Sequence, residues 1–163
     1  MSGKLRLISS LTVFFLVISL LTVQGHCQKK GMSFAEAAKN GNSLQHLDSI
    51  YLSGVHVDSL KAAFNRNLYD SVHNEYLFLL RKLGDFLTSK NFKWGKQVHC
   101  FNKIYFSQSG EIELFLYNFT PGEIDQKKIM EFESLLNEFI IGNKFRIVAK
   151  NKFSLCSSVV YND

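Results

Sequence analysis

Residues 100–119, CFNKIYFSQSGEIELFLYNF, decide the fold of this chain. The runs 100–106 and 111–119 are rich in aromatic and β-branched side chains, which favour strands. Between them, Gln108, Ser109 and Gly110 supply the residue types of a tight turn. The stretch therefore predicts a β-hairpin.

Both faces of this hairpin are apolar, so both need cover. Simple alternation assigns five side chains to one face: Ile104, Phe106, Ile112, Leu114 and Leu116. It assigns four aromatic side chains to the other: Tyr105, Phe115, Tyr117 and Phe119. We expect a helix over the first face, and either the N-terminal helices or a protein partner over the second. The four aromatic residues are therefore candidate partner-binding residues.

The segment after the hairpin predicts one long helix and a last strand. Asp125 can cap a helix over 126–141, its apolar positions form one stripe, and Gly142 and Asn143 end it. Residues 145–149 alternate as a strand, which a second run over 153–161 extends. We predict an α+β fold with an antiparallel sheet of about three strands and this amphipathic helix packed across it.

Residues 28–91 predict helices in several pieces. Ser33 can cap the run FAEAAKN, a second short helix covers 44–52, and Asp58 can cap a third in SLKAAFN. The longest should run over about 70–89, where apolar residues recur at helical spacing. Residues 28–163 are then a single mature domain, with a helical part over 28–91 and a ββαβ part over 92–163.

The N-terminus, residues 1–27, predicts a cleavable secretory signal. Lys4 and Arg6 precede LTVFFLVISLLTV (11–23), an uncharged apolar run of 13 residues that is too short to span a bilayer. Cleavage before His26 and cleavage before Gln28 both fit, and acylation of Cys27 is a further alternative. We expect an exported protein, periplasmic or extracellular, with no retained transmembrane anchor.

Composition argues against several kinds of site. The formal net charge is +5 and basic residues are scattered, so no nucleic-acid partner is expected. Neither HxxxH nor CxxC occurs, and we expect no metal, cofactor or catalytic residue. His99 beside Cys100 suggests a nucleophile pair, but neighbouring residues on a strand point to opposite faces.

Cys100 and Cys156 remain after the signal is removed. Export to an oxidising compartment predicts a disulfide between them, the alternative being two unpaired buried thiols. Lys150 and Lys152 near the last strand are interpreted as charges that protect an exposed sheet edge.

Residues 100–161 carry a family resemblance at the level of topology. The hairpin IYFSQSGEIELFLYNF, the helix IMEFESLLNEFI and the strand segment KFRIVAKNKF together resemble the C-terminal domain of TonB-type energy-transducing proteins and its small exported relatives. The resemblance implies a periplasmic or cell-surface module, without enzymatic activity, whose final strand pairs with an extended segment of a partner.

These features predict an exported, non-enzymatic, protein-binding or envelope-associated module. Its partner would be a protein of the cell envelope, bound at the last strand, through Lys150 and Lys152, or at the aromatic side of the hairpin. The alternative is a small secreted enzyme or enzyme inhibitor that uses a cysteine.

Overall fold

The computed structural model describes residues 30–163, so the predicted signal lies outside the described residues. The strands, in chain order, are β1 (Lys30–Ser33), β2 (Leu52–Ser53), β3 (Val98–Phe106), β4 (Ile112–Phe119) and β5 (Phe153–Tyr161). The helices are α2 (Phe34–Lys39), α3 (Leu44–Ile50), the 3₁₀ turn η1 (Arg66–Leu68), α4 (Tyr69–Ser89) and α5 (Gln126–Gly142). The predicted α+β class is confirmed.

The strands form one mixed sheet in the order β1-β4-β3-β5-β2. Strand β3 is antiparallel to both β4 and β5, so the hairpin prediction is confirmed. The prediction of about three antiparallel strands is wrong in detail, because β1 pairs in parallel with β4 and β2 in parallel with β5. These two strands have only four and two residues, too few to show an alternating pattern.

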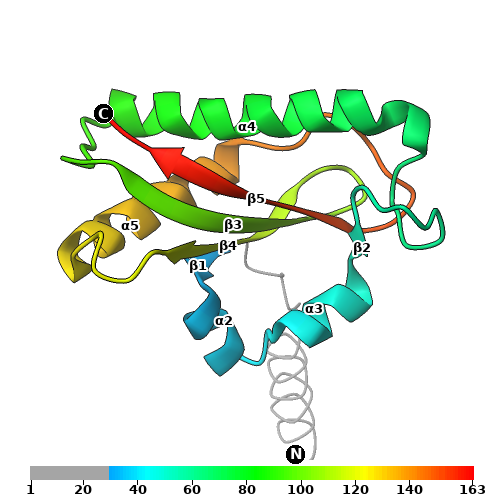
Figure 1. Ribbon diagram of the computed structural model, residues 1–163, viewed down its shortest axis with the longest axis horizontal. Helices are drawn as coiled ribbons and strands as arrows, with labels where there is room; N and C mark the ends of the chain where they lie inside the picture. The colour runs from blue at the N-terminus through cyan, green and yellow to red at the C-terminus, as the bar shows by residue number, and fades with distance from the viewer. Residues whose placement is uncertain (1–29) are drawn as a thin grey trace, which may run out of the picture.

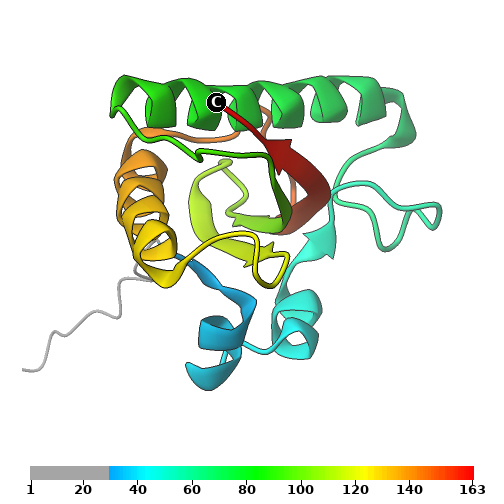
Figure 2. The ribbon, with the colours of Figure 1, turned by 60° about the vertical axis from the view of Figure 1, so that its left-hand side comes forward.

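The helices cover both faces of the sheet (Figures 1 and 2). Helices α4 and α5 enclose the larger core on one face. Their buried side chains are Val72, Tyr76, Leu79, Leu83 and Leu87 on α4, and Phe132, Leu136, Phe139 and Ile140 on α5. Helices α2 and α3 cover the other face, where Ala37 and Leu47 pack with Tyr105. Of the N-terminal helices, α4 therefore shares a face with α5, whereas α2 and α3 lie opposite.

A register shift in the hairpin changes which side chains share a face. Ile104 lies opposite Phe115 and Tyr105 opposite Leu114, with the irregularity between Tyr105 and Phe106. As a result, Phe115, Tyr117 and Phe119 join the α4–α5 core, while Tyr105, Leu114 and Leu116 face α2 and α3. All four predicted partner-binding aromatics are at most 7% exposed, so they pack inside the protein.

Two further predicted elements are wrong. The segment after Asp58 forms turns and one isolated bridge, between Ser53 and Ala62, instead of a helix. Residues 145–149 form no strand, because their backbone bonds to the hairpin turn: Phe145 N–H donates to Gly110 O (2.8 Å) and Ala149 N–H to Gln108 O (3.0 Å). The last strand is β5.

The connector after α5 is also tied to α4. The Glu75 carboxylate, which is buried on α4, accepts hydrogen bonds from the Arg146 backbone N–H (3.1 Å) and from its guanidinium Nη2 (2.6 Å). The guanidinium lies over the Phe78 ring, 4.1 Å from its centroid. This contact fixes the connector against α4.

Candidate functional site: an open strand edge beside helix α4

Strand β5 has an outer edge that is mostly open. It pairs with β3 along its full length of nine residues, but with β2 only at Phe153 and Ser154. Beyond Ser154, no strand within residues 30–163 lies on its outer side. Unpaired edges of this kind are templates for an added strand.

The backbone groups at this edge can be assigned from the bonds that β2 makes. Leu52 N–H donates to Lys152 O (3.0 Å) and Gly54 N–H to Ser154 O (2.8 Å), so even-numbered residues of β5 point their backbone groups outward. The alternation continues along the strand. Three residues therefore present both N–H and C=O at the open edge: Cys156, Ser158 and Val160.

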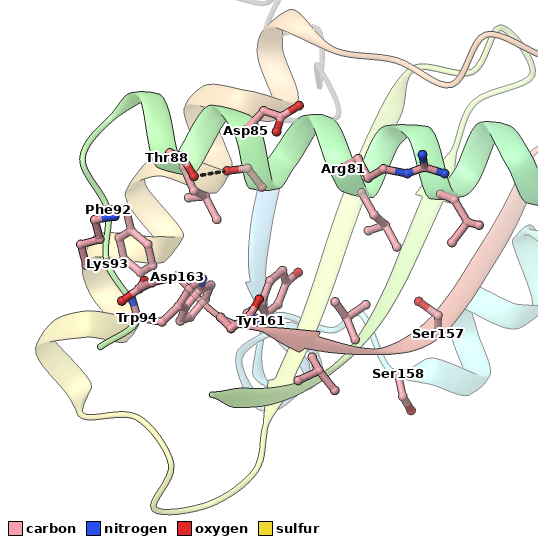
Figure 3. A pocket seen from close by; sticks show the side chains of 17 residues that line it. Arg81, Asp85, Thr88, Phe92, Lys93, Trp94, Ser157, Ser158, Tyr161 and Asp163 are labelled. Carbon is pink, nitrogen blue, oxygen red and sulfur yellow. Dashed lines mark hydrogen bonds between the residues drawn. The ribbon is translucent and has the colours of Figure 1, made fainter. Parts of the chain in front are cut away.

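A groove of about 690 Å³ runs between this edge and α4. One side is formed by a helical stripe that includes Leu77, Leu80 and Gly84, and the other by residues of β5 such as Val159. Figure 3 shows α4 above the strand, with side chains from both elements directed into the space between them. An open edge and a side-chain groove thus lie next to each other.

The sequence of α4 explains both surfaces of the helix. Its fully buried stripe repeats at helical spacing over Val72, Tyr76 and Leu83, whereas Leu77 and Leu80 are only half-buried. The second stripe is rotated from the first and faces the outer edge of β5. Helix α4 therefore packs on the core and borders the groove at the same time.

The groove is closed at one end by aromatic side chains. Trp94 stacks on Tyr161 with ring centroids 4.7 Å apart. The Asp163 carboxylate accepts hydrogen bonds from Trp94 N–H (2.7 Å) and Gly95 N–H (3.0 Å). These backbone donors lower the pKa of Asp163 below its usual 3.8, because they stabilise the charged form.

The structure does not bring Cys100 and Cys156 together. Cys100 lies opposite Val159 and faces the α4–α5 core, whereas Cys156 lies opposite Lys103 and is exposed on the other face. Both thiols are free, so the predicted disulfide does not form in this sheet. Odd and even positions of paired strands point to opposite faces, and no rotamer change moves a side chain across the sheet.

Burial raises the pKa of the Cys100 thiol to about 12, which keeps it protonated at neutral pH. Its neighbour His99 lies on the exposed face, where the imidazole Nδ1 is 2.8 Å from the Glu123 carboxylate. His99 and Cys100 therefore form no pair. A cysteine-dependent activity would rest on Cys156, which lines a separate hollow with Lys103 and Asp48.

Lys150 and Lys152 lie away from the open edge. Lys150 is in the connector before β5, where its carbonyl accepts from the Gln108 side chain (2.7 Å). The Lys152 ammonium pairs with Glu113 (2.9 Å), and its carbonyl already bonds to β2. The open edge begins further along β5. A sequence signal for it exists in the adjacent polar pair Ser157 and Ser158, in the middle of a largely apolar strand.

Comparisons with known protein families, with curated proteins and with solved structures find no match to this chain. None of the helices in residues 30–163 combines the length and the hydropathy needed to cross a bilayer. The same residues contain no group of three or more His, Cys, Asp or Glu side chains placed to hold a metal ion. The site is therefore interpreted from its own geometry.

Proposed function

We propose that the protein is an exported, non-enzymatic binding module that adds an extended segment of a partner protein, as an extra strand, to the open edge of β5. The observation that carries the proposal is the row of three residues, Cys156, Ser158 and Val160, whose backbone donors and acceptors face a groove. Strand addition uses such groups for affinity and the adjoining groove for specificity.

The position of α4 favours an extended segment over a second folded copy. The helix runs alongside β5 and extends past its outer edge (Figure 1). The groove of about 690 Å³ lies between helix and edge, where an added strand would lie. A second sheet carrying its own α4 would have to occupy the space that the first α4 already fills.

The chain's own N-terminus is a poor occupant of the groove. Lys30 begins β1, which is separated from β5 by β4 and β3. After cleavage before His26 or before Gln28, at most four residues precede Lys30. When extended, they span at most about 14 Å. The distance from β1 to β5, three strand spacings, is also roughly 14 Å, so no length remains to pass around the helices that cover the sheet.

The number of outward backbone groups on β5 limits how long a bound segment can be and how tightly its backbone can bind. Three outward residues at two-residue spacing accommodate a segment of about six residues. Their six backbone groups contribute roughly 3 to 9 kcal/mol if each hydrogen bond is worth about 0.5 to 1.5 kcal/mol. Much of this offsets the freedom lost on association, so contacts in the groove must supply the remaining affinity.

A matched pair of variants at Ser158 tests strand addition. Ser158→Pro removes the outward N–H, while Ser158→Ala keeps it and removes only the exposed hydroxyl. Random ten-residue peptides displayed on phage would be selected on the protein, and the enriched peptides synthesised and measured by fluorescence anisotropy. We expect Ser158→Ala to bind like the parent and Ser158→Pro to lose at least about tenfold in affinity.

Circular dichroism and thermal unfolding check that Ser158→Pro is folded, since an edge position tolerates proline when its N–H faces solvent. The proposal fails if the folded proline variant binds the enriched peptides as tightly as the parent does. It also fails if no peptide is enriched over a control surface.

Export is tested separately. N-terminal sequencing of the protein collected outside the cytoplasm should begin at His26 or Gln28, or show an acylated Cys27. A chain that keeps Met1 and stays in the cytoplasm would contradict this part of the proposal.

A further inference from the structure

Gly84 is an unexpected residue at its position in α4. It lies inside a helix of 21 residues, where glycine disfavours the helix more than any residue except proline. Apart from its chain neighbours and the nearby backbone of its own helix, a Cβ atom built on Gly84 would meet no atom within 4 Å. The packing of the free protein therefore gives no reason for a glycine here, yet Gly84 lines the groove beside β5.

We infer that Gly84 leaves room for a large apolar side chain of the bound segment, which makes Gly84 a specificity-determining residue. The inference rests on the proposed strand addition. Alternate side chains of an added strand would point to the α4 side of the sheet, into the groove. There they would meet the helix at Gly84, between Leu80, Leu87 and Trp94.

The β5 side chains that line the groove also favour a large apolar side chain in the bound segment. Ser157 and Val159 point to the α4 side and are small enough to leave the groove open. The Ser157 hydroxyl is already engaged with the Tyr76 hydroxyl, 3.0 Å away. The Ser157 hydroxyl already has a partner, whereas an aliphatic or aromatic side chain of the segment would contact leucine and tryptophan.

Charge adds a second feature to the expected segment. Arg81, one turn before Gly84, lines the groove and forms no ion pair among the residues that the structure describes. Asp85 also lines the groove, but its side chain is directed away from β5 (Figure 3). The expected partner is therefore an extended polypeptide with a large apolar residue opposite Gly84 and an acidic residue near it.

Gly84→Leu tests the inference with the peptides enriched on the parent protein, and Asn74→Leu, exposed on α4 outside the groove, is its matched control. We expect Gly84→Leu to lose at least about tenfold in affinity by filling the space, Gly84→Ala to lose less, and Asn74→Leu to lose nothing. The melting temperature of Gly84→Ala should equal or exceed that of the parent.

A peptide whose large apolar residue is replaced by alanine should bind the parent protein weakly. Its affinity for Gly84→Leu should be only slightly lower than for the parent, because the two changes remove the same contact. Arg81→Ala should weaken peptides that carry an acidic residue by about fivefold and reduce the salt dependence of binding.

The outcomes separate the two proposals. If Gly84→Leu binds within about twofold of the parent while Ser158→Pro loses binding, the inference on Gly84 is wrong and strand addition stands. If neither variant loses binding, strand addition itself is wrong. If Arg81→Ala binds acidic peptides as the parent does, the acidic feature of the partner is wrong.

Discussion

Replacing Gly110 by alanine tests how the hairpin turn is joined to the rest of the fold. Gly110 has φ +83°, in the left-handed region. A Cβ atom there would lie 1.9 Å from the Phe145 carbonyl oxygen, far inside contact distance. The Gly110 carbonyl also accepts the hydrogen bond from Phe145 N–H, and Phe145 is fully buried. The connector would therefore have to move away from the turn.

The cost can be worked out from these contacts. The left-handed conformation costs alanine about 1 to 2 kcal/mol, of which about 0.4 to 1 kcal/mol is offset in the unfolded chain. Losing the buried hydrogen bond adds about 1 to 3 kcal/mol, and the forced displacement of Phe145 adds about 1 to 3 kcal/mol. We expect Gly110→Ala to lower the free energy of unfolding by about 2 to 8 kcal/mol.

Gly122 provides the matched control. It has φ +80°, and a Cβ atom there meets nothing within 4 Å, so Gly122→Ala carries the conformational cost without the collision. It should lose only about 1 kcal/mol. Urea unfolding followed by the fluorescence of Trp94, the single tryptophan, measures both. Losses that agree within about 1 kcal/mol would refute the reasoning that the turn is packed against the connector.

Three further outcomes follow from the site. Hydrogen exchange of the free protein, followed by NMR, should be faster at the outward amides of Cys156 and Ser158 than at the alternate amides paired with β3, and equal protection would show that the edge is covered. In the native protein, a thiol reagent should modify Cys156 and spare Cys100 until unfolding, and a disulfide-linked peptide in the mass map would contradict the sheet. Because hydrogen bonding lowers the pKa of Asp163, its contact with Trp94 should persist above pH 3.8 and be lost as the pH falls through that lowered pKa. Asp163→Asn should abolish this acid change in Trp94 emission.

Local signals in the sequence placed the longer elements correctly. The Asp125 side chain accepts from Lys128 N–H (2.8 Å) at the start of α5, as its position before the apolar stripe predicted. The Ser33 hydroxyl does the same for α2, accepting from Glu36 N–H (3.1 Å). Helix α4 and the hairpin also lie within one or two residues of the predicted ranges. Such elements follow from periodicity and capping within a few neighbouring residues.

The candidate site could not be predicted in the same way. Alternation was extrapolated through the hairpin, but the register shift near Tyr105 places Phe115, Tyr117 and Phe119 on the same face as Ile104 instead of on the opposite one. The pairing register of β3 and β5 places Cys100 and Cys156 on opposite faces of the sheet, and their spacing in the sequence does not reveal that register. Lys152 marks a real edge, but β2 already covers that part of it.

The sequence by itself determined the α+β class, the hairpin, the two long helices and the expectation of an export signal, because each depends on contacts or composition within one short segment. Only the tertiary structure decided the five-strand order, the burial of the hairpin aromatics and the open edge of β5. Those features depend on pairing between residues far apart in the chain, where a two-residue strand such as β2 determines which backbone groups remain available for a partner.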